Sequence, residues 1–73
     1  MKIHDIIKEE MRNQGYKFLL VVIQCGGEQI RSLHKTREDA EQAKRDFEAM
    51  PIIDRILANG GIIPQSLIIQ TLD

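Results

Sequence analysis

The stretch KFLLVVIQCGGEQIRS, residues 17–32, decides the fold. Six consecutive large apolar residues (18–23) precede a pair of glycines, and a mostly polar segment follows. A strand with one face in water alternates apolar and polar side chains, whereas an unbroken apolar run is typical of a strand covered on both faces. We therefore predict that residues 16–25 form the central strand of a sheet.

The two glycines predict a hairpin. Gly26 and Gly27 can adopt positive φ at no steric cost, which suits a two-residue turn, and residues 28–35 then return antiparallel. This return strand is polar enough to lie at the edge of the sheet. Its two apolar residues, Ile30 and Leu33, differ in parity, so they point to opposite faces unless a bulge intervenes.

An amphipathic helix is expected before the central strand. Isoleucines and a methionine recur at spacings of three and four over residues 3–13, with charged residues on the other side. Gly15 then stands where a helix C-cap favours a left-handed residue.

A second helix is expected after the hairpin. Thr36, with Asp39 three residues later, has the form of a capping box, so the helix begins there. Its apolar stripe, which the two alanines allow to approach the sheet closely, consists of Ala40, Ala43, Phe47 and Met50. Pro51 ends this helix and begins a new turn.

The last third of the chain predicts a short helix and a strand. Residues 52–57 are apolar at helical spacing and lead to Asn59-Gly60-Gly61. Residues 65–71 are rich in β-branched side chains and favour a third strand, although a helix begun by Pro64 also suits the spacing of the leucines and isoleucines. The order is α-β-β-α-α-β, an α+β fold in one small domain over 1–73.

The core is expected to need either two helical layers or a partner. A helix on each face of the sheet would cover the central strand within one chain. Twelve isoleucines are a large apolar content for 73 residues, and domains of this size commonly complete their cores by dimerising. We therefore expect a homodimer.

Composition indicates a cytoplasmic protein outside the membrane. The formal net charge is -1, so no strong field draws the surface to nucleic acid or anionic lipid. No apolar run approaches the roughly 18 residues of a membrane span, and acidic residues stand where a signal peptide is apolar. Cys25 is the single cysteine, which excludes an internal disulfide and fits a reducing compartment.

The sequence gives no support to catalysis, cofactor binding or a metal site. Cys25 and His34 lie toward opposite ends of the predicted hairpin, too far apart to share a proton. Neither histidine is near enough to another ligand in sequence for a zinc site, and we expect both to be surface residues. The glycine pairs lead into a strand or end a helix, which is not the phosphate-binding arrangement. We expect a protein that is not an enzyme.

One basic segment is compatible with nucleic-acid binding. Arg31, His34, Lys35 and Arg37 form an acid-free run from the edge strand into the second helix, where phosphate could be held. Acidic residues stand on both sides of the run, and no aromatic stacking platform is evident. A small nucleic-acid-binding regulator is therefore the alternative function.

Protein association is the function that the sequence favours. The edge strand offers main-chain pairing, and the C-terminal third offers apolar area. The expected interface residues are Ile52, Ile53, Ile56, Ile62 and Ile69. We expect a binding or regulatory module that homodimerises and docks another protein.

Overall fold

The computed structural model describes residues 3–72, with side chains from residue 6 onward, and it confirms the α+β fold. Three helices and three strands follow the predicted order: α1 (Ile3–Asn13), β1 (Phe18–Gln24), β2 (Gly27–His34), α2 (Arg37–Glu48), α3 (Ile52–Ala58) and β3 (Pro64–Thr71). The strands form one antiparallel sheet in the order β2-β1-β3. Residues 64–71 are thus a strand, as favoured, and the helical alternative is wrong.

Strand β1 is buried on both faces, as its unbroken apolar run predicts. Leu19 and Val21 point to one face of the sheet, and Leu20 and Val22 point to the other. All four side chains are at most 2% exposed. Because both neighbours of β1 supply the hydrogen bonds of its backbone, the strand has no polar group that needs water.

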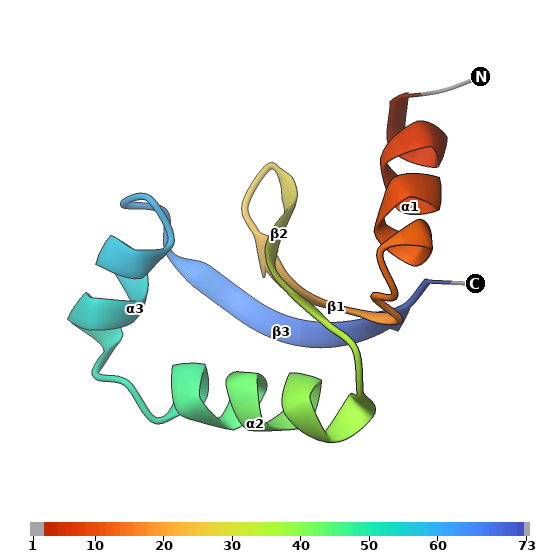
Figure 1. Ribbon diagram of the computed structural model, residues 1–73. Helices are drawn as coiled ribbons and strands as arrows, with labels where there is room; N and C mark the ends of the chain where they lie inside the picture. The colour runs from red at the N-terminus through yellow and green to blue at the C-terminus, as the bar shows by residue number, and fades with distance from the viewer. Residues whose placement is uncertain (1–2, 73) are drawn as a thin grey trace.

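Helix α2 covers one face of the sheet. It crosses beneath the strands and contacts all three of them (Figure 1). Of the predicted stripe, Ala40 is fully buried and Phe47 is 2% exposed, whereas Ala43 and Met50 are partly buried and Met50 lies beyond the end of the helix. The small alanine lets the helix approach the sheet, and the phenylalanine fills the space at the other end of the helix.

Helix α1 covers only one end of the opposite face. Met11, Tyr16 and Leu33 pack against a small cluster of Leu19, Val21 and Leu72. The helix then rises away from the sheet (Figure 1), and Ile6 and Ile7 are 52% and 44% exposed. The predicted helical cover is therefore more extensive on the α2 face than on the α1 face.

A β-bulge settles the parity of the return strand. The register shifts between Leu20 and Val21, so Arg31 is the extra residue of β2. Leu33 then lies opposite Leu19, and Ile30 lies opposite Val21. Since directly opposed residues share a face, both apolar side chains of β2 point to the α1 face.

The hairpin turn lies one residue earlier than predicted. Gln24 pairs with Gly27, so the turn residues are Cys25 and Gly26, and the Gly26-Gly27 turn is wrong. Gly26 has φ +93°, a conformation that a side chain would strain, while no described residue other than glycine has positive φ. With the bulge, this shift places His34 opposite Phe18.

The predicted helix ends are confirmed. Gly15 has φ +92° and follows the last turn of α1. The Thr36 hydroxyl accepts a hydrogen bond from the Asp39 N–H at 3.1 Å, and Pro51 precedes α3 as its N-cap. Asn59 ends α3 and is 3% exposed, because its side-chain amide donates to the Gln24 side chain at 2.9 Å and to the Ile62 carbonyl at 2.8 Å.

We predict that Leu20→Ala lowers the free energy of unfolding by about 2–5 kcal/mol, because it opens a cavity at a fully buried position. Leu57→Ala is the matched control: Leu57 is 69% exposed, so the same substitution should cost less than about 0.5 kcal/mol. Urea denaturation followed by circular dichroism measures both. Equal effects would contradict the assignment of β1 to the core.

Candidate interaction surface

The cations of the predicted basic segment each lie over an aromatic ring. The guanidinium of Arg31 is 4.4 Å from the centre of the Phe47 ring, and that of Arg37 is 5.6 Å from the Phe18 ring. The Lys35 ammonium is 5.5 Å from the Tyr16 ring. These are cation–π distances, and they involve every aromatic residue of the chain. The segment is thus attached to the fold at three places.

Arg31 holds together three parts of the fold. Its position as the extra residue of the bulge turns its side chain toward α2, where it stacks on Phe47. One guanidinium nitrogen also donates to the carbonyl of Ala58, at the end of α3, at 3.4 Å. Arg31 therefore connects the edge strand with both α2 and α3.

The three cations do not converge on one phosphate-sized site. Lys35 lies with Tyr16, which packs on the α1 side of the sheet, whereas Phe18 and Phe47 lie on the α2 side. Arg31 and Arg37 contact rings at opposite ends of α2. The continuity of the segment in sequence is lost in the fold, because strand, turn and helix send successive side chains in different directions.

His34 is buried, and the prediction of a surface histidine is wrong at this position. It is 8% exposed, and its Nδ1 lies 2.6 Å from the Asp39 carboxylate. Its Nε2 lies 2.6 Å from the Ser32 hydroxyl. A neutral imidazole that donates from Nδ1 to the carboxylate accepts at Nε2, so the Ser32 hydroxyl is then the donor. His4, the other histidine, lies outside the residues whose side chains are described.

The His34 contacts attach β2 to the first turn of α2. In a full capping box the Asp39 carboxylate would return to the Thr36 N–H, but it bonds to His34, so only half of that motif forms. Sequence reasoning missed Ser32 and this role of Asp39. The available signal was that Ser32 and His34 stand two apart on one strand and therefore share a face.

The order serine, histidine, aspartate is also that of a hydrolase triad. Ser32 and His34 line a groove of about 370 Å³ between β2 and α2. The Asp39 side chain is 67% exposed, so water screens the carboxylate that would orient the imidazole. Cys25 lies in the hairpin turn and His34 at the far end of β2, as the sequence indicated for that pair.

The described residues contain neither a metal-binding cluster nor a helix that could span a membrane. Among the side chains of residues 6–72, no three of histidine, cysteine, aspartate or glutamate gather where they could hold a metal ion. Among the described helices, none has the length and apolar character needed to cross a bilayer.

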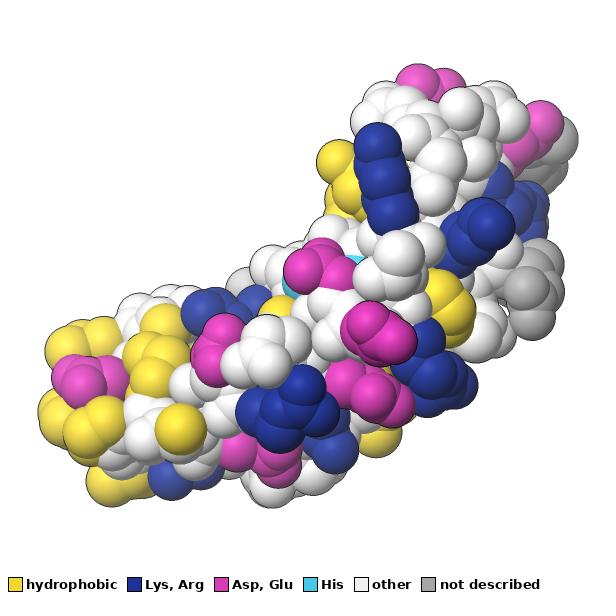
Figure 2. Space-filling view, turned by 60° about the horizontal axis from the view of Figure 1, so that its bottom comes forward, with side chains coloured by type: hydrophobic (Ala, Val, Ile, Leu, Met, Phe, Trp, Pro, Cys, Tyr) yellow, Lys and Arg dark blue, Asp and Glu magenta, His cyan; other side chains and the backbone are white. Residues whose placement is uncertain are grey.

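Exposed apolar side chains gather at the end of the molecule formed by α3 and the loop after it. We call this the α3 patch; its members are Ile52, Ile53, Leu57, Ile62 and Ile63, which are 43–69% exposed. Figure 2 shows hydrophobic side chains concentrated at this end, with charged side chains along the rest of the face. A contiguous apolar area of this kind on a small protein is typical of an interaction surface.

The structure separates the predicted interface residues into two groups. Ile52, Ile53 and Ile62 are exposed within the α3 patch, whereas Ile56 and Ile69 are partly buried. The predicted interface residues omit Leu57 and Ile63. For Leu57 the reason is that helical spacing cannot tell which side of a seven-residue helix meets the sheet, and Ile63 lies in the loop after α3, where no periodicity applies.

The two edges of the sheet differ in their protection. Strand β2 carries Glu28, Arg31 and a bulge, which are features that prevent edge-to-edge pairing. Strand β3 has no charged residue, and after the irregularity at its start it pairs regularly with β1 from Ser66 to Thr71. Its Ile68 is 38% exposed. Strand β3 is therefore the less protected edge, whereas the sequence pattern assigns main-chain pairing to the return strand of residues 28–35.

Long charged side chains stand between β3 and α2. A groove of about 470 Å³ runs between them, with Leu67, Ile68 and Ile69 on the sheet side. On the helix side it is lined by Arg37, Glu41, Lys44, Arg45 and Glu48. Charges of both signs thus lie beside an uncharged strand edge.

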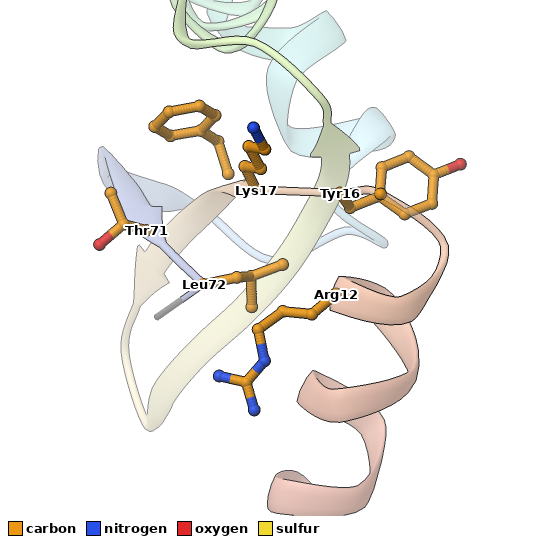
Figure 3. A pocket seen from close by; sticks show the side chains of 7 residues that line it. Arg12, Tyr16, Lys17, Thr71 and Leu72 are labelled. Carbon is orange, nitrogen blue, oxygen red and sulfur yellow. The ribbon is translucent and has the colours of Figure 1, made fainter.

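A further pocket, of about 360 Å³, lies where α1 meets the sheet. Figure 3 shows Leu72 between the side chains of Arg12 and Lys17 in this pocket. The N–H of Leu72 donates to the Lys17 carbonyl at 2.8 Å, which fixes the end of the sheet beneath the helix. This pocket lies where the end of α1, the start of β1 and the end of β3 pack together.

The fold and these surfaces define a small α+β domain with an uncovered apolar end and an unprotected sheet edge. Comparisons with protein-family models, with curated proteins and with solved structures found no match to this chain.

We predict that Asp39→Ala destabilises the fold by about 1–3 kcal/mol more than Glu38→Ala, since it leaves the buried His34 Nδ1 without its acceptor. Both acids lie in the first turn of α2, so the control loses the same favourable interaction with the helix dipole. Urea denaturation at neutral pH measures the difference. If the two variants unfold at the same urea concentration, the contact contributes no stability.

Proposed function

We propose that the protein is a non-enzymatic cytoplasmic module that forms homodimers and docks another protein. The observations that carry this proposal are the exposure of nine large apolar side chains among the described residues, five of them in the α3 patch, and the absence of charge on the edge strand β3. Covering apolar area is worth about 25 cal/mol per Å², so a second chain gains free energy by burying these side chains.

The two surfaces suit different roles. Main-chain pairing at a strand edge is self-complementary when two copies meet antiparallel, which fits homodimerisation. The α3 patch lies at the far end of the sheet from α1 (Figure 1), and it offers a convex apolar surface for another protein. The expected contacts there are Ile52, Ile53 and Ile62.

Catalysis has weaker support. The Ser32, His34 and Asp39 contacts account for the burial of the imidazole and for the attachment of α2 to β2. A hydrolase further needs donors aimed at a developing oxyanion and an enclosed substrate site, whereas the groove beside Ser32 is open.

The alternative is a nucleic-acid-binding regulator that uses Arg31, Lys35 and Arg37 on phosphates. Their exposure and charge favour it. Their separation over two faces of the sheet, and the contacts of Arg31 with Ala58 and Phe47, favour a structural role for the segment.

Self-association is tested on the wild-type chain by sedimentation velocity over a concentration series. We expect a reversible monomer–dimer equilibrium with a dissociation constant in the range of about 1–100 μM, the affinity of a small interface. A sedimentation coefficient that stays monomeric up to the highest concentration would refute the homodimer.

The alternative is tested by reversing three charges together, Arg31→Glu, Lys35→Glu and Arg37→Glu. If the protein binds nucleic acid, wild type should retard a mixed single- and double-stranded probe pool in a salt-dependent way, and the variant should not. We expect no retardation of the probes by either protein at about 0.15 M salt. Salt-dependent retardation by wild type alone would favour the alternative.

A further inference from the structure

We propose that the homodimer forms by antiparallel pairing of β3 with β3 of a second copy, around a two-fold axis perpendicular to the sheet. This gives a continuous six-stranded sheet with both α2 helices on one face. The inference rests on the proposed self-association and names the surface, the register and the charge pairs that produce it.

The β3 edge has the properties that this pairing needs. Residues 66–71 form a regular ladder with β1, carry no charge, and contain no proline. In residues 3–72 the strand has a neighbour on one side only, so its other edge presents main-chain donors and acceptors in register for a second strand. The opposite edge, β2, is interrupted by its bulge and its charges.

Charges on α2 are complementary to those of a second α2 running antiparallel to it. Along the groove beside β3 the helix presents Arg37, Glu41, Lys44, Arg45 and Glu48. Apart from Arg45, which adds a second positive charge next to Lys44, the signs alternate. In an antiparallel pair related by a two-fold axis, Arg37 faces Glu48 of the other copy, and Glu41 faces Lys44. All four contacts between the helices are then between opposite charges, which favours this orientation over a parallel one.

The distance between the helices suits long side chains. Helix α2 is centred over the central strand β1. The two helices of the dimer are therefore as far apart as the two β1 strands, which have the two β3 strands between them. Three strand spacings of about 4.8 Å place the helix axes about 14 Å apart. Side chains of Arg, Lys and Glu can span that gap, whereas apolar side chains would leave it partly empty. This explains why the groove is charged on the helix side.

Two independent features place the axis at the same point. The alternating charges of α2 are centred between Gln42 and Ala43. Arg37 lies over Phe18, which pairs with Thr71, so the start of α2 is level with the end of β3. Moving along the helix to that centre covers roughly 8 Å, or about 2–3 strand residues, and reaches residues 68–69. The regular part of β3 has the same centre.

Parity then selects the register. With both α2 helices on one face, two directly opposed residues must point to the same face, so their sequence numbers differ by an even number. One residue of β3 then lies opposite its own copy, and the two-fold axis passes between the two. An axis at Ile68 places Ile68 opposite Ile68 of the other copy and Leu67 opposite Ile69. These pairs are apolar throughout, and they cover the side chain that β3 leaves exposed.

The test uses Lys44→Glu and Glu41→Lys as separate variants. Each alone places two pairs of like charges across the axis, so we expect its dimer dissociation constant to rise roughly tenfold or more at low salt. Mixed in equal amounts, the two variants have complementary charges at both contacts, and the heterodimer should form within about threefold of the wild-type dissociation constant. Asp46→Lys, which lies toward the β2 side of α2, is the matched control and should dimerise like wild type.

Sedimentation of each variant and of the mixture distinguishes the outcomes. Loss of dimer in both variants with recovery in the mixture supports the proposal, because a folding defect cannot be rescued by a second defective chain. If wild type dimerises and both variants dimerise equally well, this interface is overturned while self-association stands. If wild type remains monomeric, self-association itself fails.

The register is tested by cross-linking. In a Cys25→Ser background, Ile68→Cys places a thiol on the axis, where opposed Cβ atoms lie about 4.5–5.5 Å apart and a disulfide can close with a small adjustment. Mild oxidation should convert the wild-type-like dimer to a covalent one. Ile53→Cys in the same background is more exposed and should cross-link far more slowly. Equal rates for the two would overturn the β3 pairing.

Discussion

The requirement that β1 be covered on both faces determines the arrangement of everything around it. Its side chains from Leu19 to Val22 are apolar without interruption, so each face of the strand loses free energy in water unless another layer covers it. Helix α2 provides that layer beneath the sheet, and α1 provides part of it above. The two edge strands satisfy the backbone of β1 from both sides. Among the described residues, the apolar side chains of the α3 patch and the isoleucines Ile6 and Ile7 of α1 stay exposed.

Residues that the sequence pattern suggests as phosphate contacts instead hold the helices and strands together. Arg31, Lys35 and Arg37 each lie over an aromatic ring, and His34 joins β2 to α2 through Ser32 and Asp39. A small core gives each such contact a larger share of the total stability. The contacts of the basic segment therefore describe how the layers are joined, and the exposed apolar side chains of the α3 patch lie outside that segment.

Most of the fold follows from local patterns. Gly15, Thr36 and Pro51 each have a backbone or capping role at a helix end, so these ends can be predicted from the sequence. The position of the hairpin turn was misread by one residue, because two adjacent glycines allow two turn placements and the choice depends on how β2 pairs with β1. The exposure of Ile56 and Ile69 could not be predicted either, since apolar spacing on a short helix or strand does not show which side packs on the rest of the fold.

The sequence by itself determined the order of elements, the central place of β1 in the sheet and the need of β1 for a covering layer on both faces. These properties depend on the periodicity and content of apolar residues. Only the tertiary structure decided that Arg31 is the extra residue of a bulge, that His34 is buried, and that β3 is the less protected edge beside charges of both signs. Those properties arise from residues far apart in the chain meeting across the sheet, and no local pattern encodes such a meeting.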